Sequence, residues 1–119
     1  VVIGGCVAGP GRRSGELGAL LVGYYEDDGG ERRLRYAGKV GTGFDAATLR
    51  LLAERLEPLR TDRSPFIGRQ PQKDAVFVEP RLVCEVQFSE WTTSGTLRQP
   101  SYQGLRDDKP ATDVVREVG

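Results

Sequence analysis

The fold is decided by residues 17–40, which read LGALLVGYYEDDGGERRLRYAGKV. Apolar, β-branched and aromatic side chains recur in two runs, about Leu17–Tyr25 and Leu34–Val40, and the sequence Asp27-Asp28-Gly29-Gly30 lies between them. Asp and Gly adopt the backbone angles of a tight hairpin turn at little cost, so this sequence between two apolar runs is a strong hairpin signal. These residues therefore predict an antiparallel β-hairpin.

A helix is predicted directly after the hairpin. Asp45 is a good N-cap residue, and Phe44 precedes it at the N′ position of a hydrophobic staple with Leu49. Apolar residues then repeat at helical spacing along one face, namely Leu49, Leu52, Ala53 and Leu56. Pro58 is expected to end the helix, and the charged opposite face indicates that the helix caps a core.

Further strands are predicted on both sides of this unit. The run Val1–Val7 is β-prone, whereas Thr61–Asp74 contains two prolines and suggests an irregular loop. Alternating apolar residues predict a strand from about Leu82 to Phe88 with one mostly wet face. A turn at Thr93-Ser94-Gly95 then leads into a short fifth strand at Thr96–Arg98.

This order of elements predicts an all-β fold, a five-stranded oligonucleotide-binding (OB) barrel with one capping α-helix. An open α+β sheet with one helix is the alternative, and the helix in the middle of the strand order favours the barrel. The 119 residues fit one domain, residues 1–119. The apolar start Val1-Val2-Ile3, without Met, suggests a domain excised from a longer chain.

Charge and composition limit the possible functions. The chain carries 17 basic and 17 acidic residues, and this balance argues against tight autonomous binding of nucleic acid. All basic residues except three lysines are arginine, so a local surface that binds phosphate remains possible.

With no histidine and two separated cysteines, a metal site is not expected. No apolar run is long enough for a membrane span and none resembles a signal peptide, so a cytoplasmic location is expected.

Several catalytic signatures are absent from the sequence. No Gly-Lys pair completes a P-loop, and Gly41-Thr42-Gly43 lacks the third glycine of a dinucleotide-binding fingerprint. Without histidine, the usual base for a serine or cysteine nucleophile is also missing. We therefore expect no complete active site within this chain.

Two segments nevertheless have the chemistry to meet phosphate. In Tyr36–Phe44, Lys39 lies where a predicted strand leads into a glycine-rich turn. A cation beside exposed backbone N–H groups suits a phosphate oxygen. A tight turn that needs glycine for its backbone angles explains the segment equally well. In Gly104–Pro110, Arg106 and Lys109 flank a carboxylate, and a solvated charged turn is the simpler explanation from chemistry alone.

The second segment carries a family resemblance. Arg106-Asp107-Asp108-Lys109 is similar to the RxDK motif VI of the covalent nucleotidyltransferases, which include DNA ligases and mRNA capping enzymes. An ordered set of further segments resembles the prokaryotic ATP-dependent DNA ligases of the nonhomologous end-joining type more than a capping enzyme. These segments are Val2–Gly5, Gly18–Gly23, Ala37–Phe44, Ser64–Phe66, Glu79–Val83 and Glu90–Thr92.

The resemblance implies a C-terminal lid that closes on a catalytic domain during enzyme adenylation. Arg106 and Lys109 would then orient the β- and γ-phosphates of ATP, with Asp108 holding one of the two cations. ATP and Mg²⁺ would act in the full enzyme, and none is expected on this domain alone. Because none of the three lysines stands in a KxDG motif, the isolated chain should be inactive.

The resemblance also implies a second partner, nicked double-stranded DNA in a prokaryotic, nucleoid-associated setting. The residues expected to face it are Lys39, Gly41 and Gly43, together with Arg12 and Arg13, through sequence-independent backbone contacts. Two other functions stay open from the sequence. One is an autonomous single-strand-binding module that uses Tyr24, Tyr25, Tyr36 and Trp91; the other is a protein-interaction domain.

Overall fold

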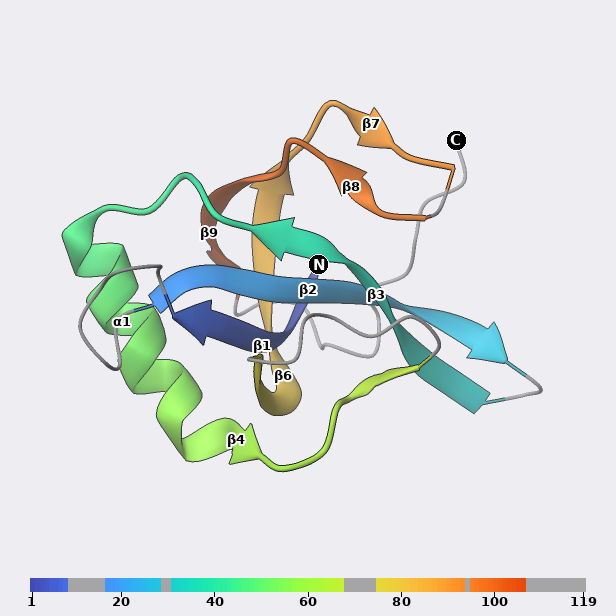
Figure 1. Ribbon diagram of the computed structural model, residues 1–119, viewed down its shortest axis with the longest axis horizontal. Helices are drawn as coiled ribbons and strands as arrows, with labels where there is room; N and C mark the ends of the chain where they lie inside the picture. Colours follow the sequence, from blue (N-terminus) through green and yellow to red (C-terminus); the bar gives the residue numbers. More distant parts are fainter. Residues whose placement is uncertain (9–16, 29–30, 68–74, 94, 107–119) are drawn as a thin grey trace.

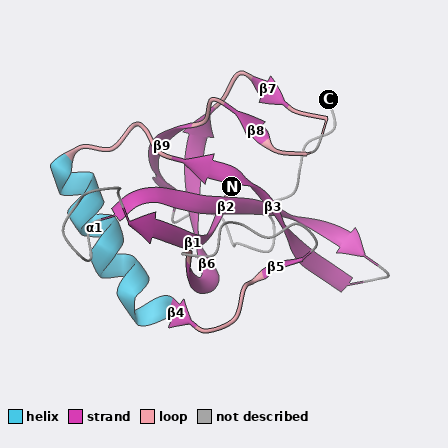
Figure 2. Cartoon of the chain, in the orientation of Figure 1, coloured by secondary structure: helices cyan, strands magenta, loops and turns pink. Residues whose placement is uncertain are grey.

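The computed structural model describes residues 1–8, 17–28, 31–67, 75–93 and 95–106, which fold into one α-helix and nine strands (Figure 1). The helices are α1 (Ala46–Leu56) and the short 3-10 helix η1 (Glu57–Leu59). The strands are β1 (Val2–Ala8), β2 (Leu17–Asp28), β3 (Glu31–Val40), β4 (Arg60–Thr61), β5 (Phe66–Ile67), β6 (Val76–Gln87), β7 (Glu90–Trp91), β8 (Leu97–Arg98) and β9 (Ser101–Arg106). Within these residues the prediction of a mostly β chain with one α-helix is confirmed (Figure 2).

Most of the strands belong to one sheet. Its order is β4-β6-β1-β2-β3-β5, and β9 also pairs with β6. The predicted hairpin is confirmed as β2 and β3, and both strands extend beyond the predicted ends. Glu26 lies opposite Arg33 in this extension, and opposite charges across a strand pair favour continued pairing.

The closed barrel is not detected, because no ladder joins β3 to β9 within the described part of the chain. The two strands nevertheless approach each other just beyond the end of β3. The backbone N–H of Tyr102 in β9 donates a hydrogen bond of 2.9 Å to the carbonyl oxygen of Thr42. One hydrogen bond therefore joins β9 to the residues that directly follow β3.

Helix α1 begins as predicted at Asp45, whose side-chain Oδ1 accepts a 2.7 Å hydrogen bond from the backbone N–H of Thr48. Hydrogen bonds from Thr48 also hold the pKa of the Asp45 carboxyl below its usual value. Leu52 and Leu56 are buried, but Ala53 is exposed, so its assignment to the apolar face was wrong. No helix in the described segments is long and apolar enough to cross a membrane.

Strand β6 starts at Val76, earlier than the predicted start near Leu82. Its pairing with β1 jumps from Leu82, opposite Ile3, to Phe77, opposite Gly5. Pro80 lies inside this interruption and has no N–H to donate to a ladder, which is consistent with the jump in the pairing. In Figure 1 the strand is sharply curled near its beginning.

The predicted short strand at Thr96–Arg98 is confirmed, but it does not join the main sheet. Leu97–Arg98 forms β8, which pairs with β7 in a separate two-stranded sheet. The main sheet instead contains β9, whose last three residues, Gly104–Arg106, belong to the segment that the sequence suggested to be a charged turn. The turn at Thr93–Gly95 is retained, because it connects β7 with β8.

The core lies on both faces of the central strands. One cluster contains Ile3, Leu20 and Val22 together with Leu52 and Leu56 of α1. The other contains Val2, Leu21, Leu34, Phe66 and Val83. Because neighbouring residues of a strand point to opposite faces, these two sets bury β1, β2 and β6 from both sides.

The contrast between Leu52 and Ala53 gives a first prediction. Leu52 is fully buried, so Leu52→Ala should lower the free energy of unfolding by about 2–5 kcal/mol. Ala53→Ser alters an exposed position and should change it by no more than about 0.5 kcal/mol. Urea denaturation followed by circular dichroism measures both changes, and equal effects would contradict this placement of α1.

Candidate functional site

Arg106 lies at the end of β9, opposite Val83 of β6. Its Nη1 atom is 3.2 Å from Oε1 of Glu85, and the two side chains are 37% and 63% exposed. The sequence predicted that Asp108 would hold a cation here, but Asp108 and Lys109 lie outside the described residues. Glu85 was missed as a partner, although its place on the wet face of a predicted strand was a usable signal.

The second candidate segment connects β3 to α1. Lys39 is exposed near the end of β3, opposite Leu21, and Gly41 and Gly43 are exposed in the turn that follows. This arrangement confirms that a lysine leaves a strand into a glycine-containing turn. Arg12 and Arg13, which were also predicted to face DNA, lie outside the described residues.

The two glycines of this turn have different structural roles. Gly43 has a φ of +92°, and a Cβ there would lie 2.4 Å from the carbonyl oxygen of Tyr102. Packing against β9 therefore requires glycine at position 43, whatever the turn binds. A Cβ at Gly41 would lie 3.9 Å from the Cβ of Ala19, an ordinary contact, so space does not require glycine there.

The two candidate segments do not converge through their strand positions. The turn that follows Lys39 contacts Tyr102 through the hydrogen bond to Thr42. Arg106 lies four residues farther along β9, which corresponds to roughly 13 Å of extended strand. The structure therefore keeps the two candidate segments apart, one near each end of β9.

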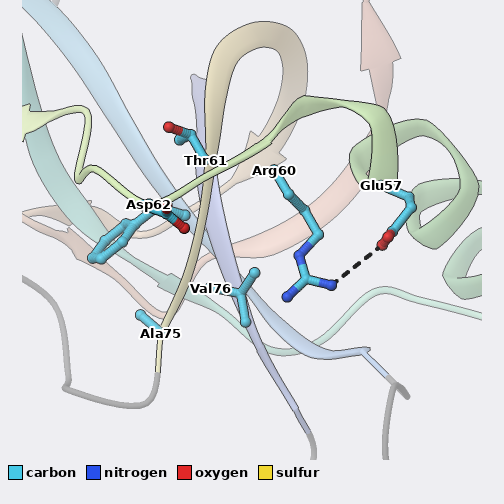
Figure 3. Close-up of a pocket in the computed structure, with 7 residues that line it drawn as sticks. Glu57, Arg60, Thr61, Asp62, Ala75 and Val76 are labelled. Carbon is cyan, nitrogen blue, oxygen red and sulfur yellow. Dashed lines mark ion pairs between the residues drawn. The ribbon is translucent and has the colours of Figure 1, made fainter.

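A shallow pocket of about 590 Å³ lies elsewhere, between η1, β4 and the start of β6 (Figure 3). Glu57 and Arg60 face each other at 3.6 Å on its wall. None of the predicted site residues lines this pocket; its lining residues are Glu57, Arg60, Thr61, Asp62, Ala75, Val76 and Phe77.

Neither cysteine is prepared for nucleophilic chemistry. Burial raises the pKa of the Cys84 thiol to about 11, and burial also raises the pKa of Cys6 despite the nearby Arg60. Both thiols are thus protonated at neutral pH, as expected for small core residues. Among the described residues, no group of three or more His, Cys, Asp or Glu side chains gathers to hold a metal ion.

The aromatic residues considered for base stacking are mostly used in packing. Tyr24 is buried and meets Trp91 edge to face at 5.2 Å between ring centroids. Tyr36 meets the buried Phe66 in the same manner at 5.3 Å. Phe88 was not among these candidates; it contacts Trp91 and, at 38% exposed, is more accessible than the candidate rings. This use of the rings weakens the hypothesis of an autonomous single-strand-binding module.

Comparison with known proteins gives a consistent match. Residues 13–109 match the family model described as the ATP dependent DNA ligase C terminal region. The chain is 50% identical, over 98% of its length, to the multifunctional non-homologous end joining DNA repair protein LigD of Mycobacterium tuberculosis, and it spans 15% of that protein. It is also 48% identical, over 85% of its length, to LigD of Pseudomonas aeruginosa, of which it spans 12%.

Solved structures agree with this match. The ligase domain of M. tuberculosis LigD superposes with a TM-score of 0.88 at 47% identity, covering 98% of this chain and 37% of that domain. A mycobacterial DNA ligase D complexed with ATP and MES superposes with a TM-score of 0.81 at 46% identity, over 98% of this chain and 36% of the other. The chain is therefore similar to a minor part of each relative.

The contrast between Gly43 and Gly41 can be tested directly. Gly43→Ala should destabilise the fold by at least about 1–3 kcal/mol, because it combines a strained φ with a clash against Tyr102. Gly41→Ala, which meets no close atom, is the matched control and should leave the unfolding midpoint nearly unchanged. Chemical denaturation of both variants measures this difference, and an unaffected Gly43→Ala protein would contradict the described approach of β3 to β9.

Proposed function

The chain belongs to the family of C-terminal regions of ATP-dependent DNA ligases, close to the ligase domain of mycobacterial end-joining enzymes, and we propose that it is the lid that closes over ATP during adenylation. The observation that carries this proposal is the extent of the match. It covers nearly the whole chain and includes all of the RxDK segment, residues 106–109. A mycobacterial relative that binds ATP supports ATP as the nucleotide.

The proposed chemistry follows from charge. In the catalytic domain, a lysine attacks the α-phosphorus of ATP, and the bond to the pyrophosphate leaving group breaks. Negative charge then grows on the β- and γ-phosphates. Arg106 and Lys109 would neutralise this charge and hold the leaving group in line, while Asp108 would orient one of the cations. Mg²⁺ bound in the complete enzyme would share this electrostatic role.

The chain supplies positioning but no nucleophile of its own. None of its three lysines stands in a KxDG motif, so residues 1–119 alone should not become adenylated. As a module of a bacterial ligase, the chain would work in the cytoplasm beside the nucleoid. The OB barrel remains part of this proposal, and the Thr42–Tyr102 hydrogen bond is the contact that supports closure between β3 and β9.

A second face would bind nicked duplex DNA after the lid swings away. Lys39 is exposed, and the turn at Gly41 and Gly43 presents an exposed backbone beside it. Contacts of this kind reach phosphates and sugars without reading bases, which suits an enzyme that joins any sequence. Arg12 and Arg13 are included in this face from the sequence alone. A net charge of zero suits a lid that needs its catalytic domain for tight binding.

Adenylation tests the lid directly. In a ligase that carries this chain after its catalytic domain, Arg106→Ala should slow lysine adenylation from labelled ATP by roughly a hundredfold, as expected when one donor to a developing negative charge is lost. Lys109→Ala should have a similar effect. Arg81→Ala is a suitable control, because Arg81 is an exposed arginine of β6 outside the RxDK segment. Normal adenylation by the Arg106→Ala and Lys109→Ala enzymes would disprove the proposed role.

Salt dependence tests the DNA face. Lys39→Ala should weaken binding of a nicked duplex equally for all sequences and should reduce the salt slope by about one unit, because one phosphate contact is lost. Fluorescence anisotropy over a range of salt concentrations measures both quantities, with Lys39→Arg as the charge-retaining control. An unchanged slope in Lys39→Ala would remove Lys39 from the DNA face.

A further inference from the structure

The ion pair between Arg106 and Glu85 fixes the end of β9 to β6 through side chains. Nη1 of Arg106 donates a 3.2 Å hydrogen bond to Oε1 of Glu85, and both residues are partly open to solvent. The two residues come from different strands, so their pairing depends on the register between β6 and β9.

The register explains why these two side chains meet. Arg106 lies opposite Val83, and Glu85 lies opposite Gly104, so all four positions share one face of the strand pair. The carboxylate of Glu85 reaches diagonally across the strand pair to the guanidinium of Arg106. The buried Val83 is the residue directly opposite Arg106 on β6.

Stability alone gives little reason for this pair. Exposed ion pairs contribute little to folding, because water screens the charges and both side chains lose conformational freedom. Its main physical consequence is orientation, since a guanidinium held on one side by a carboxylate has a restricted direction. Arg carries five N–H donors in a planar fork, more than one carboxylate can accept, so a guanidinium can contact a carboxylate and a phosphate together.

We propose that Glu85 is a positioning residue for Arg106, holding its guanidinium toward the β- and γ-phosphates before the lid closes. This inference rests on the proposed role of Arg106 in adenylation. Glu85 does not touch the nucleotide. It restricts the Arg106 side chain in advance, so that less conformational freedom is lost when ATP binds. Its removal should therefore affect the adenylation step and leave the fold and the later sealing step intact.

The chain offers a matched control for this test. Glu79 and Arg81 lie on the same strand β6, and their side chains are also 3.2 Å apart and largely exposed. Glu79→Ala removes an equivalent surface carboxylate without touching Arg106. Glu85→Gln is the conservative variant, because its amide oxygen can still accept the hydrogen bond from Nη1.

The experiment compares these variants in a ligase that contains this chain and its catalytic domain. The rate of lysine adenylation is measured over a range of ATP concentrations, together with the melting temperature and the sealing of a pre-adenylated nick. Glu85→Ala should lower the adenylation kcat roughly tenfold, through misplacement of Arg106. Glu85→Gln should recover most of the activity, and Glu79→Ala should equal the parent. Melting temperature and sealing should stay unchanged in all three.

A double variant separates positioning from other effects. If Glu85 acts through Arg106, then Glu85→Ala should cause no further loss in an Arg106→Ala background. Parental or faster adenylation by Glu85→Ala, with Arg106→Ala still defective, would overturn the role of Glu85 and leave the proposed function standing. Normal adenylation by Arg106→Ala would instead overturn the proposed function itself. Additive losses in the double variant would also reject the inference. The same holds if Glu85→Ala melts at a lower temperature and Glu85→Gln does not recover adenylation.

Discussion

The backbone of Tyr102 lies where β9 meets the residues that follow β3, and much of the structure depends on this contact. Its N–H donates to the carbonyl oxygen of Thr42, and its ring lies 5.0 Å from that of Phe44. Gly43 provides the space for this approach, because a Cβ there would clash with the Tyr102 backbone. Thr42, Gly43 and Phe44 also lead into α1. One close contact therefore sets the curl of the sheet, the entry to the helix and the path of β9.

The core on both faces of the central strands limits the surface that is available for ligand binding. Side chains of β1, β2 and β6 are buried on both faces, in clusters that contain Ile3 and Leu20 on one side and Val2 and Leu21 on the other. Little of the central sheet is left to face a ligand. The functional candidates accordingly lie at strand ends and turns, with Lys39 near the end of β3 and Arg106 at the end of β9. Loops and strand ends carried by a rigid sheet are common places for binding residues.

Local patterns predicted the elements whose signals are contained in short stretches of chain. The β2–β3 hairpin follows from its turn residues, and the start of α1 follows from the Asp45 cap. The same reasoning failed where pairing between distant segments decides the structure. Strand β6 begins at Val76, before the predicted start near Leu82, and it passes through Pro80 where its ladder with β1 is interrupted. Strand β9 has a weak pattern of its own and forms because β6 offers it an edge.

The sequence by itself determined the family, the single α-helix, the central hairpin and the identity of the RxDK segment, because each is encoded by adjacent residues or by an ordered set of motifs. Tertiary structure decided which side chains act together. Only the register of β6 and β9 brings Glu85 to Arg106, residues far apart in the chain. Only the approach of β9 shows that Gly43 serves packing while Gly41 does not require it. These relations depend on distances between remote backbone segments, which a local pattern does not contain.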